Sequence, residues 1–187
     1  MSTPIAFERA FANALQQLAA PASGQPDRAA LAALRRGLGR QPGETIEPYR
    51  VILTLPGARP ARWQEDACFL VAGLFAWHLR PWHGPADGPT NLGASLRRHA
   101  DQKPGDGPER RFVALLNADR EDLPVHLRHV VGLLRTSETT IDYAQLLRDV
   151  QAWSAETRHV QRAWSRAFWR QSTAANALAA SADAPAS

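Results

Sequence analysis

The sequence predicts an all-α protein arranged as a two-lobed helical bundle. Apolar residues recur every three or four positions along most of the 187-residue chain, which is the period of a helix with one buried face. No stretch alternates apolar and polar residues for long enough to predict a β-sheet. Between residues 81 and 108, five prolines and five glycines separate the two helical parts.

Four helices are expected in the first part. The first begins near Pro4 and ends at Pro21, since proline is favoured in a first turn and disfavoured in a helix interior. The second is opened by Pro26 and Asp27, carries an apolar face that ends with Leu38, and is closed by Gly37 and Gly39; the other two are expected at about 47–55 and 61–80. The last of them carries apolar residues on more than one face, which predicts a central position with burial on several sides.

Five helices are expected after residue 90. Asn91 is a suitable N-cap for the first of them, Pro124 lies in the first turn of the third, and Thr140 or Asp142 caps the fourth. Their expected ranges are about 91–99, 109–123, 124–134, 142–153 and 155–169.

The chain is therefore expected to have four parts. An N-terminal helical lobe takes residues 1–100 and a boundary loop takes 101–108. A C-terminal helical bundle with a basic face takes 109–170, and a disordered tail of small polar residues takes 171–187.

Composition excludes several classes of protein. Hydrophobic residues make up 44% and charged residues 21%, as in soluble globular proteins. Cys68 is the single cysteine, so neither an intramolecular disulfide nor a multi-cysteine zinc site is possible. The longest apolar run, 67–77, is too short to span a bilayer, and the N-terminus lacks a signal-peptide pattern. These features predict a cytoplasmic protein.

Motifs for cofactors and catalysis are also missing from the sequence. It has no phosphate-binding GxxxxGK[ST] loop, no GxGxxG, no GxSxG and no HExxH. We therefore expect no enzymatic activity, no cofactor and no metal. Cys68 and His78 are expected in the core, together with Trp63 and Trp164. Trp82, in the proline- and glycine-rich segment, is left open.

Arginine placement carries the strongest functional signal. Lys103 is the only lysine among the 22 basic residues. Four arginines, spaced four residues apart, lie along the last expected helix on the side opposite its apolar stripe: Arg158, Arg162, Arg166 and Arg170. Like charges at this spacing repel each other, and planar guanidinium groups bind phosphate oxygens in pairs. The row favours a polyanion partner, and the alternative is an ordinary solvated helix surface.

Arginines of the preceding helices extend this candidate surface. Arg110 and Arg111 open one helix, while Arg128 and Arg135 lie seven apart on one flank of the next. Arg120, within ADRED, is either part of the surface or a structural ion-pair residue.

Three segments of the chain resemble the CasB family, the small subunit of the type I-E CRISPR surveillance complex Cascade. They are NLGASLRRHA (91–100), ERRFVALLNADREDLPVHLRHVVGLLRTSETTIDYAQLLRDVQAW (109–153) and HVQRAWSRAFW (159–169), which together cover about a third of the chain. Residues 1–90 resemble the family in helix layout and in the apolar run at 63–78.

The resemblance implies an all-helical, two-lobed subunit without enzymatic activity. Its implied partners are the other Cascade subunits of the crRNA-containing complex, a second copy of the chain, target DNA and the displaced single strand. Binding of both DNA strands would stabilise the R-loop, while cleavage belongs to a separately recruited helicase-nuclease. Carried over by motif, the basic surface of the family maps to Arg111, Arg120, Arg128, Arg158 and Arg162, with Arg97 and Arg98 as further candidates.

Two other functions remain open from the sequence alone. A helix-turn-helix regulator would use 124–134 as its recognition helix, although this segment offers mostly Val, Leu and His for reading bases. A pure protein–protein adaptor would make no contact with nucleic acid.

Overall fold

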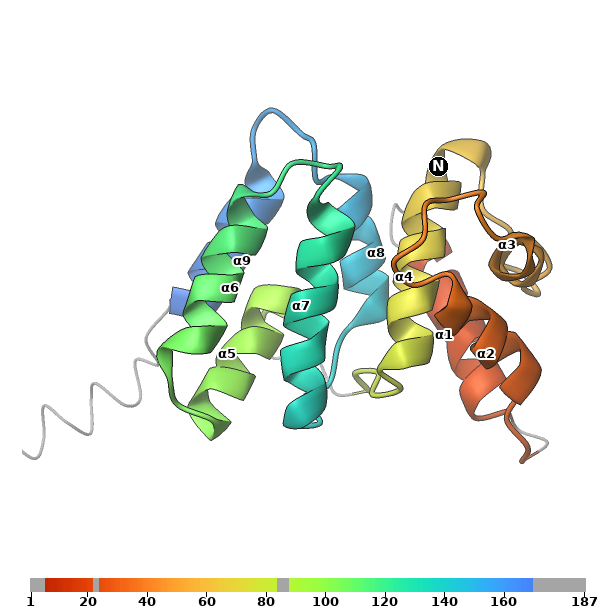
Figure 1. The fold of residues 1–187 in the computed structure, drawn as a ribbon, viewed down its shortest axis with the longest axis horizontal. Helices are drawn as coiled ribbons and strands as arrows, with labels where there is room; N and C mark the ends of the chain where they lie inside the picture. Colours follow the sequence, from red (N-terminus) through yellow and green to blue (C-terminus); the bar gives the residue numbers. More distant parts are fainter. Residues whose placement is uncertain (1–5, 22–23, 84–87, 170–187) are drawn as a thin grey trace, which may run out of the picture.

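The structure, a computed structural model, describes residues 6–21, 24–83 and 88–169, and within these ranges the protein is all-helical (Figure 1). Nine α-helices and one short 3₁₀ helix make up the described part, which confirms the predicted fold class. The expected start of the first helix near Pro4 and the expected tail at 171–187 lie outside the described residues.

Helices of the first part gather around α4 (Glu65–Trp77), to the right in Figure 1. Nine of the 13 residues of α4 are buried, so the predicted central position is confirmed. The helix ends at Trp77, with His78 as its C-cap, and not at Arg80. The elements before it are α1 (Ala6–Ala19), α2 (Arg28–Arg36), α3 (Ile46–Leu53) and η1 (Arg62–Gln64).

Helices of the second part lie to the left of these in Figure 1, with α8 between the two groups. Asn91 caps α5 and Asp142 caps α8 by accepting the amides of Ala94 and Gln145 at 3.1 and 3.0 Å. The second bond decides between the two caps predicted for α8. The helices are α5 (Leu92–Gln102), α6 (Asp106–Asn117), α7 (Leu123–Thr136), α8 (Tyr143–Gln151) and α9 (His159–Trp169).

The two groups share one hydrophobic core, which runs from Phe11 in α1 to Phe168 in α9. Helix α5 extends into the expected boundary segment at 101–108, as far as Gln102, and packs against α6, α7 and α9. The division of the chain at that boundary stays a prediction.

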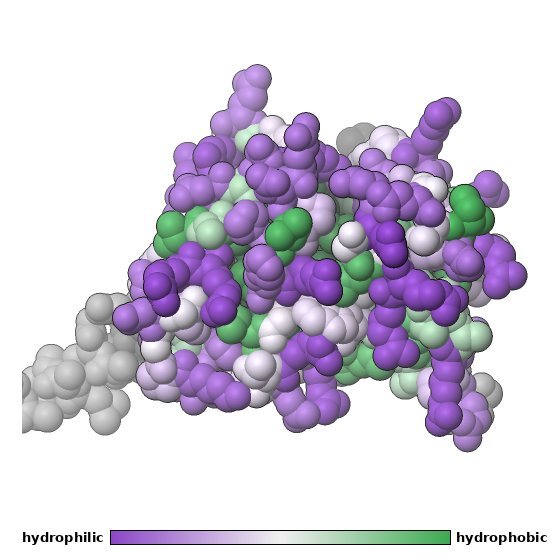
Figure 2. All heavy atoms as spheres, in the orientation of Figure 1, coloured by the Kyte–Doolittle hydropathy of each residue, from purple (hydrophilic) through white to green (hydrophobic). Residues whose placement is uncertain are grey.

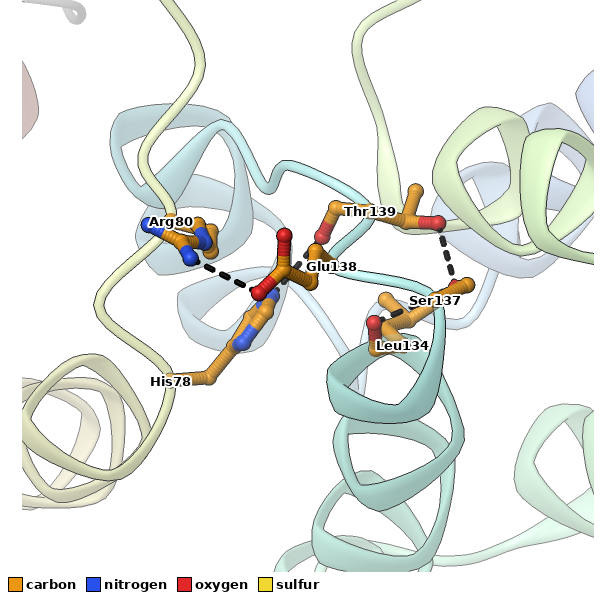
Figure 3. Close-up of polar contacts among 6 residues, drawn as sticks. All are labelled: His78, Arg80, Leu134, Ser137, Glu138 and Thr139. Carbon is orange, nitrogen blue, oxygen red and sulfur yellow. Dashed lines mark hydrogen bonds and ion pairs between the residues drawn. The ribbon is translucent and has the colours of Figure 1, made fainter.

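Polar contacts between two connecting segments join the groups (Figure 3). After α4, His78 lies close to the α7–α8 connection, where its Nε2–H donates to the Thr139 carbonyl at 2.7 Å. Arg80 forms an ion pair with Glu138 at 2.8 Å. The Ile141 amide donates to the Arg80 carbonyl at 2.9 Å, which completes a short parallel bridge between Pro81 and Ile141.

Buried positions agree with the sequence except at Trp63. Cys68 and Trp164 are fully buried and His78 is 4% exposed, as expected. Trp63 is 71% exposed, so its predicted place in the core is wrong. The reason is that α4 begins only at Glu65, so Trp63 lies in η1 and off the buried face of α4, while the neighbouring Gln64 is buried.

Both ends of the helix predicted at 109–123 differ from the structure, in which this helix already begins at Asp106. The helix predicted at 109–123 is α6 and ends at Asn117. Asp119 then accepts the amides of Glu121 and Asp122, both at 3.0 Å, and so forms a turn before α7. Pro124 lies in the first turn of α7, as predicted.

Helix α5 crosses α9 at Gly93, where a side chain has no room. A Cβ atom at this position would lie 2.2 Å from the carbonyl oxygen of Trp164. We expect Gly93→Ala to lower the free energy of unfolding by about 2 kcal/mol, because overpacking outweighs the better helix propensity of alanine. Urea denaturation measures this change.

Gly88→Ala is the matched control, since a Cβ there meets nothing within 4 Å. It should leave the free energy of unfolding within about 0.5 kcal/mol of the parent value. Equal stability of the two variants would contradict the close approach of α5 and α9.

Candidate nucleic-acid interface

Helix α9 separates buried apolar residues from exposed arginines. Val160, Trp164 and Phe168 are at most 4% exposed, whereas Arg162 and Arg166 are exposed on the other side of the helix. Two of the four arginines in the predicted row therefore lie on the solvent face of one helix. Arg170 lies outside the described residues.

Arg158 precedes α9, so the predicted helix start near residue 155 is wrong. Its backbone has a left-handed φ of 47°, which departs from a helical path. Its carbonyl accepts the amide of Arg162 at 3.1 Å, which makes Arg158 the residue that opens the helix. Its guanidinium reaches back to α6 and donates to the Leu116 carbonyl at 2.5 Å.

Buried polar contacts fix α9 to the rest of the bundle. Trp164 Nε1 donates to the Asp149 carboxylate at 2.6 Å, and Gln145 donates to the same group at 2.8 Å. Burial raises the pKa of Asp149 to about 6, against the lowering effect of these hydrogen bonds. Gln161 Nε2 donates to the Trp153 carbonyl at 2.9 Å. These bonds set the direction in which the arginines of α9 point.

A groove of about 540 Å³ lies between α6 and α9, and we call it the α6–α9 groove. Charged groups in it are the guanidiniums of Arg158 and Arg162 and the carboxylate of Glu156. Its remaining lining residues are Val113, Leu116, Asn117, Thr157, Gln161, Ser165 and Trp169. Arg110 and Arg111 are exposed on α6 outside the groove.

Carboxylate partners are scarce for these arginines. Ion pairs within the described ranges are Arg40–Glu44, Arg80–Glu138 and Arg97–Asp101. The exposed arginines of α6, α9 and the turn before α9 are thus free of carboxylate partners in this part of the chain. Such a set attracts anions, since planar guanidiniums bind phosphate oxygens in pairs.

Arg120 and Arg128 line a separate cleft of about 560 Å³, between the α2–α3 loop and α7. Arg120 donates to the Val150 carbonyl at 3.0 Å, so its structural bond goes to a helix end and not to a carboxylate. Arg128 and Arg135 both lie over the Trp77 ring, at 5.9 and 4.5 Å from its centre. This cation–π arrangement fixes them beside α4.

Arg97 and Arg98 on α5 have partners within the protein. Arg97 pairs with Asp101 at 2.7 Å. Arg98 donates to Ser95 at 2.9 Å, and its guanidinium lies 4.9 Å from the centre of the Trp82 ring. Burial lowers the pKa of Arg98. These contacts leave less of both guanidiniums available to a ligand than those of Arg162 and Arg166.

Of the predicted site residues that the structure describes, Arg158 and Arg162 line the α6–α9 groove, while Arg110, Arg111 and Arg166 are exposed on α6 and α9 outside its lining. Arg120 and Arg128 line the second cleft, Arg135 lies over Trp77, and Arg97 and Arg98 are on α5. The groove residues that the sequence reasoning missed include Val113, Gln161 and Trp169. Their helical spacing indicates only that they flank apolar stripes. Hydrophilic residues cover most of the face shown in Figure 2, and its hydrophobic patches are small and separate.

The described residues contain neither a candidate metal site nor a membrane-spanning helix. No group of three or more His, Cys, Asp or Glu side chains in the described ranges is placed to hold a metal ion. Among the helices of those ranges, none has the length and apolar character needed to cross a bilayer.

Comparisons with known proteins agree on one family. The family model for CRISPR-associated protein Cse2 matches residues 30–169. A relative described as CRISPR-associated protein Cse2, from Thermus thermophilus, is 35% identical over 146 residues, which are 75% of this chain and 79% of the relative.

Solved structures show the same likeness. The crystal structure of M. ruber CasB is 31% identical, with a TM-score of 0.72, and the match covers 94% of this chain and 98% of that one. A chain of a CRISPR RNA-guided surveillance complex is 27% identical, again with a TM-score of 0.72 and covering 94% of this chain and 98% of that one.

Burial of the Asp149 carboxyl group makes stability depend on pH. Because the pKa of Asp149 is about 6 in the folded state and 3.8 ordinarily, the folded state holds this proton more tightly. Its contribution to stability is present below pH 4 and is lost as the pH rises through 6. Between pH 4 and 7 the free energy of unfolding should fall by about 2 kcal/mol on this account.

Asp149→Asn removes the titration and keeps an oxygen that accepts from Trp164. We would measure the free energy of unfolding by urea denaturation at pH 4, 5.5 and 7. With increasing pH, this free energy should fall less, or rise more, for the variant than for the parent protein. Parallel pH profiles of the two proteins would contradict this role of Asp149.

Proposed function

Because the chain belongs to the CRISPR-associated Cse2 family, also called CasB, we propose that it is the small, non-catalytic subunit of a type I-E Cascade surveillance complex. In this role it binds nucleic-acid backbone without regard to sequence and stabilises the R-loop, through the target strand and the displaced strand. Its partners are the other Cascade subunits, the crRNA-containing complex and a second copy of the chain.

The observation that carries the proposal is the set of arginines at α6 and α9. Arg162 and Arg166 are exposed on the outer face of α9, which is itself held in place by the buried bond from Trp164 to Asp149. Phosphates along a single strand are evenly spaced anions, and guanidiniums on one rigid helix suit them. The basic surface therefore supports binding through the backbone.

Backbone contacts suffice for this function because R-loop formation is nearly balanced. The RNA–DNA heteroduplex is about as stable as the DNA duplex it replaces, so a few contacts to the displaced strand shift the equilibrium. Free affinity for nucleic acid is expected to be weak. Within the assembled complex, the high effective concentration of the strands compensates for it.

A sequence-reading regulator receives less support from the geometry. The helix it would insert into the major groove is α7, whose Leu127, Val130 and Leu134 are fully buried. Arg128 and Arg135, the arginines of that helix, lie over Trp77. A protein–protein adaptor without nucleic-acid contact would leave the exposed arginines of α9 without a role.

Salt dependence of binding tests the proposal. Each phosphate contact to a single strand contributes roughly −0.7 to the slope of log affinity against log salt concentration. The double variant Arg162→Gln/Arg166→Gln should reduce the magnitude of the slope by about 1.4. It should also lower the affinity for single strands of unrelated sequence by equal factors. Fluorescence anisotropy with labelled oligonucleotides, from 50 to 300 mM salt, measures both effects.

Arg35→Gln/Arg36→Gln is the matched control, because it removes the same charge from exposed positions at the end of α2. It should leave the slope unchanged. The proposal fails if the purified protein shows no salt-dependent binding to any nucleic acid, or if both double variants change the slope by the same amount.

A further inference from the structure

The α6–α9 groove holds apolar surface between its charges. Val113 and Trp169 line it and are 41% and 40% exposed. Phosphate binding alone has no use for apolar walls, because a phosphate needs only cations and hydrogen-bond donors. An exposed indole beside guanidiniums is instead the combination that takes a base together with its backbone.

The indole of Trp169 is held by its neighbours. Its ring centre lies 5.4 Å from that of Phe112 and 5.1 Å from that of Phe168. Its Nε1 donates to the carboxylate of Glu109 at 3.1 Å. A ring fixed in this way loses little conformational freedom when a second ring stacks on it.

Gln161, another lining residue of this groove, carries an unpartnered acceptor. The residue is 7% exposed, and its Nε2 already donates to the Trp153 carbonyl. Its Oε1 has no hydrogen-bond partner among the described residues. A buried acceptor without a partner is costly, and each of the four bases carries an N–H donor on its Watson–Crick edge.

Charge and size also fit a nucleotide. Arg158 and Arg162 outweigh Glu156, so the groove carries a net charge of one positive unit. Its volume of about 540 Å³ lies within the range of sites for small organic ligands. The groove also opens at the N-terminal turn of the 11-residue helix α9, and that end of a helix dipole favours anions.

We propose that the α6–α9 groove is a nucleotide site. One unstacked base of a bound single strand lies against Trp169 with its polar edge toward Gln161, and Arg158 and Arg162 hold the adjacent phosphates. This inference rests on the proposed function and adds to it a contact with a base, independent of which base is present.

Removal of the bases from the probe separates the two contributions. We would compare a twelve-nucleotide oligothymidylate with an abasic oligomer of the same length, which keeps every phosphate. The full-length protein should bind oligothymidylate at least fivefold more tightly than the abasic oligomer, since stacking on an aromatic side chain gives a gain of this order. The salt slopes should be the same for both oligomers.

Trp169→Leu should reduce this preference to less than twofold and leave the affinity for the abasic oligomer unchanged. Trp63→Leu is the matched control, because it removes a more exposed indole, in η1, and should keep the full preference. Thermal melting of both variants shows whether each is folded.

Equal affinity of the parent protein for the two oligomers, with salt dependence intact, would overturn the nucleotide site and leave the backbone proposal standing. A preference that survives in folded Trp169→Leu would overturn the assignment to this groove. Loss of binding to both oligomers would instead refute the proposed function. The comparison of oligomers with the parent protein decides the first point without any variant.

Discussion

The contact between the segment after α4 and the α7–α8 connection determines the arrangement of the whole chain. His78 donates to the Thr139 carbonyl, and the Tyr143 hydroxyl donates to the His78 carbonyl at 2.5 Å (Figure 3 shows the first of these). Burial lowers the pKa of His78 and so favours its neutral form. These bonds fix where α8 begins, and Asp149 of α8 in turn holds Trp164 of α9. The orientation of the arginines on α9 thus depends on a buried contact near the other end of α8.

Most of the fold was predictable because its signals are local. Helical periodicity gave the elements, and capping residues such as Asn91 and Asp142 gave their starts within a few positions. Wrong ends arose where a turn interrupts an apparently continuous pattern, as at Asp119 and at Arg158. A left-handed arginine leaves no mark in an amino-acid sequence, so the start of α9 required the backbone itself.

The candidate site was predictable only in part, because it depends on which helices meet. Spacing by four placed Arg162 and Arg166 together on α9, since both belong to one helix. The groove needs α6 beside α9, and the sequence contains no signal for that pairing. Arg98, Arg128 and Arg135 were candidates by charge, yet each lies over a tryptophan ring. Trp63 was expected in the core, because an aromatic residue next to a buried helix is most often part of that core, yet it is exposed.

One arginine in each of the two clefts combines two roles that a lysine would not. Arg158 and Arg120 each donate to a carbonyl near the end of a helix, at Leu116 and Val150, with one nitrogen. A guanidinium carries five N–H donors, so the rest remain available to phosphate oxygens. A group held by one internal bond loses less freedom on binding than a mobile side chain. The near absence of lysine is therefore consistent with a rigid surface, which under the proposed function would recognise the spacing of charges along a strand and not its sequence.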